Sequence, residues 1–166
     1  MYQVGEYLVH PGQGVCRVAE IVSEPRESYM LRPVGMRNAM LISFPVASEA
    51  RLRPILSKGE AQELIGDYPT MDVDDFTGRS VSLEEEHFKD QIRRGTCRDS
   101  VRVVKTFRTR IAAVRRRNKK PPVAYERILK QASERSLLEL AVALGVTTDD
   151  VRRLFEQQAG EDPSLT

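Results

Sequence analysis

Tryptophan is absent from this chain of 166 residues, and cysteine and histidine each occur only twice. Cys16 and Cys97 are far apart and form no CxxC pair, so the sequence offers no zinc motif, and we expect both to be buried apolar residues. His10 and His87 have no serine, cysteine or carboxylate at the spacing of a catalytic triad or metal site. We therefore predict no enzyme activity, no metal, no cofactor and no small-molecule substrate.

Long apolar runs are also missing, because the longest one is too short to span a bilayer. Residues 1–6 contain neither the basic nor the apolar region of a secretory signal. With 40% hydrophobic and 30% charged residues, the composition is that of a globular protein. We expect no membrane association, a cytoplasmic location, a monomeric state, and one well-buried domain or two small ones.

Charge is unevenly distributed, although the formal net charge of the whole chain is only +2. Residues 71–88 contain 6 acidic residues and 1 basic residue, whereas residues 89–120 contain 13 basic and 2 acidic residues. A positive excess of this size within one segment is typical of a surface that binds a polyanion. The run 115–120, RRRNKK, is the densest part of it, and phosphate contact is one interpretation of this segment.

Short segments with period-two alternation occupy the first third of the chain and are separated by Pro-, Gly- and Asn-containing turns. They predict five strands, at 6–10, 14–21, 28–34, 39–44 and 51–55. Five short strands this close together hide their inner faces best as a small SH3- or Tudor-like β-barrel. The apolar residues expected in its core are Val9, Val15, Val18, Ile21, Leu31, Ile42, Val46 and Leu52.

Helical periodicity replaces the strand pattern in the rest of the chain and predicts helices at 58–65, 83–94, 98–118, 124–144 and 148–158. Ser57 and Glu60 have the spacing of a capping box, Gly145 suits a helix end, and Thr147 or Thr148 suits the next helix start. We predict an α+β fold, with a β-barrel and short helix over 1–66, an acidic linker over 67–80, a compact all-helical domain over 81–160 and a disordered tail over 161–166.

Several motifs together resemble the CarD/CdnL family of bacterial transcription regulators, which bind RNA polymerase. In the first half these are VGEYLVHPGQGV at 4–15, YML at 29–31, MLISFP at 40–45 and RLRPI at 51–55. In the second half, RG at 94–95, VRVVK at 101–105 and the segment 126–141 are similar to the family's helical region. The order and spacing of the motifs carry this resemblance, which extends over nearly the whole chain.

The resemblance implies two domains with different partners. The amino-terminal barrel would bind the β subunit of bacterial RNA polymerase through an exposed strand, a mode in which a partner strand adds to the free edge. The helical domain would contact promoter DNA weakly at the upstream edge of the bubble, mostly through the phosphate backbone of the DNA. It would thereby modulate open-complex stability. The residues that the resemblance assigns to polymerase binding are Arg17, Met40, Leu41, Ile42, Ser43, Phe44 and Arg53.

The DNA side of this expectation departs from the family in three places. Relatives insert a tryptophan into the minor groove, whereas Val81 or a near neighbour stands at that position here. Glu84, Glu85 and Glu86 follow where relatives carry basic residues, and Glu126 replaces a frequent lysine. The residues expected to contact DNA are Arg79, Val81, Lys89, Arg93, Arg94, Arg98, Arg102 and Arg127.

Two alternative functions stay open from the sequence. In one, the chain binds polymerase but has lost DNA contact, which the missing tryptophan and the glutamate run favour. In the other, residues 140–155 form a helix-turn-helix with 147–153 as recognition helix, although that helix begins Thr-Asp-Asp. A metal site at 84–87 is disfavoured because adjacent carboxylates on one helix point in different directions.

Overall fold

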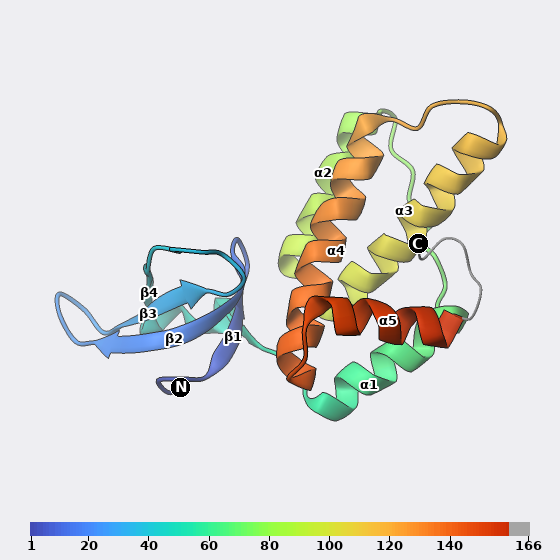
Figure 1. Ribbon diagram of the computed structural model, residues 1–166. Helices are drawn as coiled ribbons and strands as arrows, with labels where there is room; N and C mark the ends of the chain where they lie inside the picture. The colour runs from blue at the N-terminus through green and yellow to red at the C-terminus, as the bar shows by residue number, and fades with distance from the viewer. Residues whose placement is uncertain (160–166) are drawn as a thin grey trace. The chain divides into compact units, whose positions relative to one another are not determined.

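The structure is a computed structural model in which residues 1–159 are described. The predicted tail at 161–166 lies outside the described residues. The chain divides into two compact units, the first spanning Met1–Ile55 and the second beginning at Leu56. The first is built from strands and the second from helices, so the predicted α+β class is confirmed (Figure 1).

An antiparallel sheet of five strands forms the first unit, in the spatial order β4-β3-β2-β1-β5. The 3₁₀ helix η1, Val46–Arg51, connects its two edge strands. The strands are β1 Tyr7–His10, β2 Gly14–Val22, β3 Ser28–Pro33, β4 Ile42–Pro45 and β5 Arg53–Pro54.

Strand β4 begins three residues later than the predicted 39–44, and Pro33 accounts for the difference. The register pairs Leu31 with Ile42 as a hydrogen-bonded pair, and the next hydrogen-bonded pair along the two strands would join Pro33 to Met40. Proline has no N–H to donate across that pair, and the ladder therefore stops. Residues 39–41 consequently leave the sheet and remain outside regular secondary structure.

The sheet encloses a small apolar core around Leu8, Val18 and Tyr29. Of the predicted core residues, Val9, Val15, Val18, Leu31 and Leu52 are buried, whereas the other three are partly buried. Tyr29, which the prediction left out, is fully buried, and its hydroxyl donates to Glu49 Oε2 at 2.6 Å. This bond satisfies the polar end of an otherwise apolar side chain.

Five α-helices make up the described part of the second unit, in which α2, α3 and α4 run side by side while α1 and α5 cover one end (Figure 1). Two apolar clusters hold it together, one at α1 and α5 and the other between α2, α3 and α4. The helices are α1 Lys58–Asp67, α2 Val81–Arg94, α3 Cys97–Arg116, α4 Val123–Leu144 and α5 Thr148–Ala159.

Local signals account for most of the helix ends. The capping box of Ser57 and Glu60 is present as predicted, and Gly145 ends α4 in the left-handed conformation with φ of 69°. Thr147 accepts from the amide of Asp150 and thus starts α5. At the α2–α3 corner, a Cβ on Gly95 would meet the Gln91 carbonyl oxygen at 2.5 Å, so the corner has no room for a side chain.

The structure places the boundary between the units earlier than residue 66. The apolar face of α1, which includes Leu64 and Ile65, packs against Leu140 and Val151, so α1 belongs to the helical unit. Packing of this face decides the assignment, because an isolated short helix has little stability of its own.

The acidic segment that we predicted as a linker is attached to α3. Lys105 Nζ donates to the carbonyls of Tyr68, Pro69 and Met71 at 2.9, 3.0 and 2.6 Å. Further on, the amide of Asp74 donates to Thr106 Oγ1 at 2.9 Å. Residues 68–76 are therefore an integral part of the helical unit.

Candidate functional site

The outer edge of β4 has no strand beside it, because within the described chain β4 pairs with β3 alone. The amide of Val46 donates to the Glu27 carbonyl at 3.0 Å, which makes this a hydrogen-bonded pair. Such pairs alternate along an antiparallel ladder, so Phe44 and Ile42 bond to β3. The N–H and C=O of Ser43 therefore point outward and are free to pair with another strand.

Exposed apolar side chains lie next to this edge. Met40 is 84% exposed and Leu41 39%, and Met36, in the turn that precedes them, is 65% exposed. Large apolar side chains gathered beside a free strand edge are typical of a protein-interaction surface. Met36 was missed from the sequence, although its position before an Arg-Asn turn could have signalled it.

Two residues assigned to polymerase binding do not lie on the free edge of β4, and a third is only partly available there. Phe44 is buried opposite Tyr29, so its side chain belongs to the core of the sheet. Arg53 lies on β5, the other edge strand of the sheet, and not with β4. Ile42 is partly buried against the core, whereas Ser43 is exposed.

Arg17, also predicted to bind polymerase, is exposed on β2. Its Nε donates to the Gly5 carbonyl at 3.1 Å, and its guanidinium lies 5.4 Å from the centre of the Tyr7 ring. These contacts hold the side chain against the neighbouring strand β1 and the residues before it. The structure therefore brings together Met40, Leu41 and Ser43, and leaves Arg17 and Arg53 on other strands.

Most of the basic side chains expected to contact DNA are paired within the helical unit. Lys89 and Arg127 both contact Glu85, at 2.8 and 3.0 Å. Arg98 contacts Asp67 at 2.9 Å, and Arg102 is half-buried. Asp90 forms ion pairs with Arg93 and Arg94 at 2.8 and 3.0 Å.

The remaining two residues of that set lie at the start of α2. Arg79 is exposed in the turn before the helix, and Val81, its first residue, is 39% exposed. Leu83, 49% exposed, adds a second apolar side chain to this turn.

Three successive glutamates of α2 have three different environments. Glu84 is buried, where it accepts from the Gly78 amide at 3.2 Å and from the Tyr125 hydroxyl at 3.0 Å. Burial and this bond raise the pKa of Tyr125. Glu85 forms a bidentate pair with Arg127, whereas Glu86 is exposed. The run is thus largely structural, and of the three only Glu86 has no ion-pair partner within residues 1–159.

The pair of Glu85 with Arg127 should make the stability of the helical unit depend on pH. The hydrogen bond from Arg127, followed by that from Lys89, lowers the pKa of Glu85 to about 2. Because its pKa is lower in the folded state, ionised Glu85 stabilises the fold at pH values above its unfolded pKa of 4.5. This stabilisation is lost as the pH falls towards 2. Thermal unfolding at several pH values should therefore show a smaller acid-dependent loss in Glu85→Gln than in the parent protein. Equal losses would contradict the pairing.

Helices α4 and α5 are joined by the short turn that the helix-turn-helix alternative requires. Asp149 and Asp150 stand in the first turn of α5 and pair with Arg152 and Arg153 at 2.6 and 3.3 Å. Val151 and Phe155 of the same helix are buried. The start of α5 thus presents carboxylates where a recognition helix would approach DNA phosphates.

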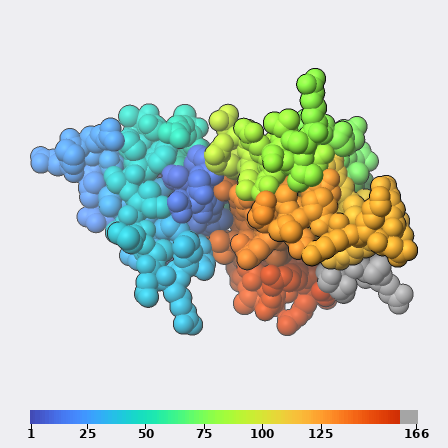
Figure 2. Space-filling model, turned by 90° about the horizontal axis from the view of Figure 1, so that it is seen from above, coloured from blue at the N-terminus to red at the C-terminus, as the bar shows by residue number. Residues whose placement is uncertain are grey.

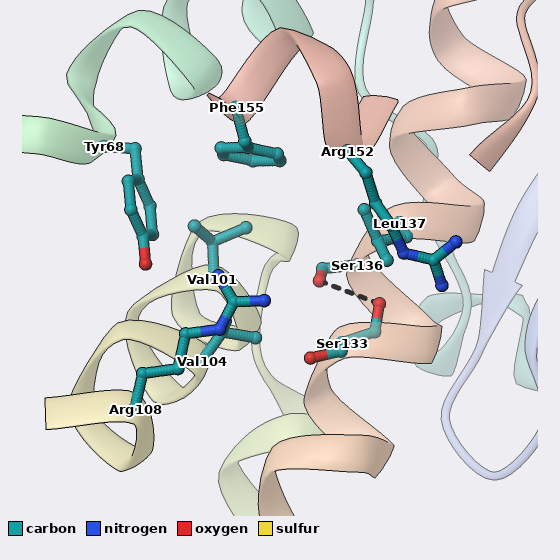
Figure 3. A pocket seen from close by; sticks show the side chains of 9 residues that line it. All are labelled: Tyr68, Val101, Val104, Arg108, Ser133, Ser136, Leu137, Arg152 and Phe155. Atoms are coloured by element: carbon teal, nitrogen blue, oxygen red, sulfur yellow. Dashed lines mark hydrogen bonds between the residues drawn. The ribbon is translucent and has the colours of Figure 1, made fainter. Parts of the chain in front are cut away.

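A cavity of about 40 Å³ lies between Tyr68 and helices α3, α4 and α5 (Figure 3). Val101, Val104 and Phe155 line it with apolar surface, and Arg108 reaches over it from α3. A space of this size holds water molecules and is too small for a substrate.

Residues 1–159 contain no group of three or more histidine, cysteine or acidic residues arranged to hold a metal ion. Their helices include none that is both long and apolar enough to cross a membrane.

The free edge of β4, with the exposed apolar side chains beside it, makes the first unit resemble a protein-interaction domain. Residues 2–56 match the family model described as the CarD-like/TRCF RID domain, and this range agrees with the first unit of the structure. The first unit is therefore a CarD-like/TRCF RID domain, and domains of this family interact with RNA polymerase. This match supports a CarD-like RNA polymerase-interacting protein. A comparison with curated proteins finds no match.

Proposed function

We propose that this protein binds the β subunit of bacterial RNA polymerase by strand addition at β4, contacts promoter DNA through its helical unit at the upstream edge of the bubble, and so modulates the stability of the open complex. The observation that carries the proposal is the free outer edge of β4, with the N–H and C=O of Ser43 pointing away from β3. It agrees with the match of residues 2–56 to a polymerase-interaction domain.

The edge of β4 favours a partner with an extended backbone and apolar side chains. Main-chain hydrogen bonds to Ser43 would supply affinity, and contact with Met40 and Leu41 would supply specificity. Ser43 itself carries no charge, so at this position binding would depend on the backbone and on Met40 and Leu41, and not on an ion pair.

DNA contact is supported by the positive excess of residues 89–120 within the helical unit and by the start of α2. Val81 and Leu83 are partly exposed there, beside the exposed Arg79. Apolar side chains can enter the minor groove and unstack a base step, and in this chain they would replace the family's tryptophan. Because both are smaller, we expect a weaker hold on the open complex than a tryptophan would give.

Binding to purified RNA polymerase core and to the isolated β subunit tests the first half of the proposal. We expect the full chain to bind both with similar affinity, because the contact is confined to β. Binding to the core without binding to β would overturn the assignment of the subunit, and no binding to either would overturn polymerase docking.

The second candidate, a polymerase-binding module without DNA contact, is favoured by the ion pairs of Lys89, Arg93 and Arg94. Binding of the full chain to a forked promoter fragment separates the two functions. A DNA-contacting protein should bind the fragment and lose affinity steeply as salt rises. A polymerase-only module should show no binding at any salt concentration.

A further inference from the structure

The positive charge of residues 89–120 is not equally available to a partner. Its first part is occupied within the helical unit, where Lys105 binds backbone carbonyls and Arg110 contacts Glu84 and the carbonyls of Asp74 and Phe76. The side chains of four residues near the end of α3 form no hydrogen bond or ion pair with any described residue. All four are exposed, and we call them the basic end: Arg116, Arg117, Lys119 and Lys120.

The basic end lies where three helix termini meet. Arg115, at the end of α3, contacts Glu126 in the first turn of α4 at 3.6 Å, and Arg127 contacts Glu85 in the first turn of α2. Figure 1 shows these termini at the end of the helical unit opposite α1 and α5, and Figure 2, seen from above, shows the segment around residue 120 at the surface. The exposed Glu86 is the one carboxylate among these glutamates that lacks a partner within residues 1–159.

Stabilisation of a helix end does not explain this cluster. Cations favour the negative end of a helix dipole, but the effect is confined to the last turn. Arg115 and Arg116 meet that condition, whereas Lys119 and Lys120 lie beyond α3 in the connection to α4. Pro122, at the start of α4, supplies no side-chain cap, so the first amides of that helix add further positive potential at this end.

We infer that the basic end is the DNA-binding surface of this protein and holds phosphates of duplex DNA without reading sequence. This inference rests on the proposed function and replaces the predicted contacts at Lys89, Arg93, Arg94 and Arg98. The cluster consists of long cationic side chains, which suit phosphates. It contains no aromatic residue that could stack on the bases of a single strand.

Anisotropy of a fluorescent DNA duplex of random sequence, measured with the full chain over a range of salt, tests the inference. The variant Arg116→Gln/Arg117→Gln/Lys119→Gln/Lys120→Gln should lower affinity on the order of 100-fold or more near 0.1 M salt. The slope of log affinity against log salt should fall by about 3 to 4, since each phosphate contact contributes about 0.9. Circular dichroism should show an unchanged fold because all four residues are exposed.

A matched control removes four cations elsewhere in the same unit, at Lys58, Lys130, Arg152 and Arg153, all exposed. Its duplex affinity should stay within about three-fold of the parent's, because charges far from the contact are screened. A variant with glutamine at Lys89, Arg93, Arg94 and Arg98 represents the competing surface. A larger loss in either of these variants than in the basic-end variant would overturn the inference.

The partner class and the independence from polymerase docking need separate readouts. Duplex DNA should displace the probe better than polyglutamate of equal charge; equal displacement would assign the surface to an acidic protein segment and overturn the inference. The basic-end variant should bind polymerase like the parent protein. Failure of the parent to bind polymerase, with the salt slope still dependent on the basic end, would remove the docking proposal and leave the DNA surface standing.

Discussion

Replacement of Ser43 by proline should reduce affinity for RNA polymerase about 100-fold, because the edge loses the backbone N–H that a partner strand would bind and gains a ring in its place. Ser43 and Met30 form a non-hydrogen-bonded pair, so the proline removes no bond between β4 and β3. Ile42, the residue before it, is already in a strand, as a proline requires. Titration of the polymerase core with the full-length variant measures the loss.

Ser43→Ala is the matched control for this experiment, because it removes the hydroxyl and keeps the outward N–H. It should bind polymerase with the affinity of the parent protein. Equal losses in both variants would assign the contact to the serine side chain, and unchanged binding by the proline variant would exclude strand addition at β4. A charged residue at Ile42 is a poorer probe, since that side chain packs against the core of the sheet.

Glu84→Ala should lower the free energy of unfolding of the helical unit by about 3 kcal/mol or more, the usual cost of removing one partner from a buried charged network. The substitution leaves the Gly78 amide and the Tyr125 hydroxyl without their acceptor and Arg110 without its carboxylate. For a unit of this size, the unfolding midpoint should fall by more than about 10 °C. Calorimetry of the full chain measures this.

The neighbouring Glu86→Ala supplies the control, because Glu86 is exposed and has no ion pair with any residue in the described range. Its unfolding midpoint should match that of the parent protein, and its affinity for duplex DNA should rise slightly as a negative charge is removed. A similar loss of stability in both variants would show that the alanines act through helix properties and not through the buried network.

The elements of this fold are readable from its sequence because their signals are local. Alternation of apolar residues located the strands, helical spacing located α1 to α5, and Ser57, Gly145 and Thr147 mark helix ends as expected. The late start of β4 is an exception with a local cause, the missing N–H of Pro33. That cause was invisible until the register between the two strands was known.

The candidate site was less predictable, since its residues are defined by contacts across the chain. The sequence pointed to the segment 40–44, but only the register separates the buried Phe44 from Ser43, whose backbone groups face outward. Similarly, the basic segment was recognisable, but Arg98 and Lys105 have partners about 30 or more residues away, on the segment 67–71. The spacing of residues within α3 does not predict those partners, because they lie on another segment of the chain.

By itself, the sequence determined the α+β class, the order of the helices and strands, and the family of the amino-terminal domain, because each depends on residue patterns within short segments. Tertiary structure alone decided that α1 belongs with the helices, which backbone groups of β4 are free, and which cations remain for a partner. Those three outcomes depend on burial and pairing between distant segments. The spacing of residues along one helix or strand predicts neither this burial nor this pairing.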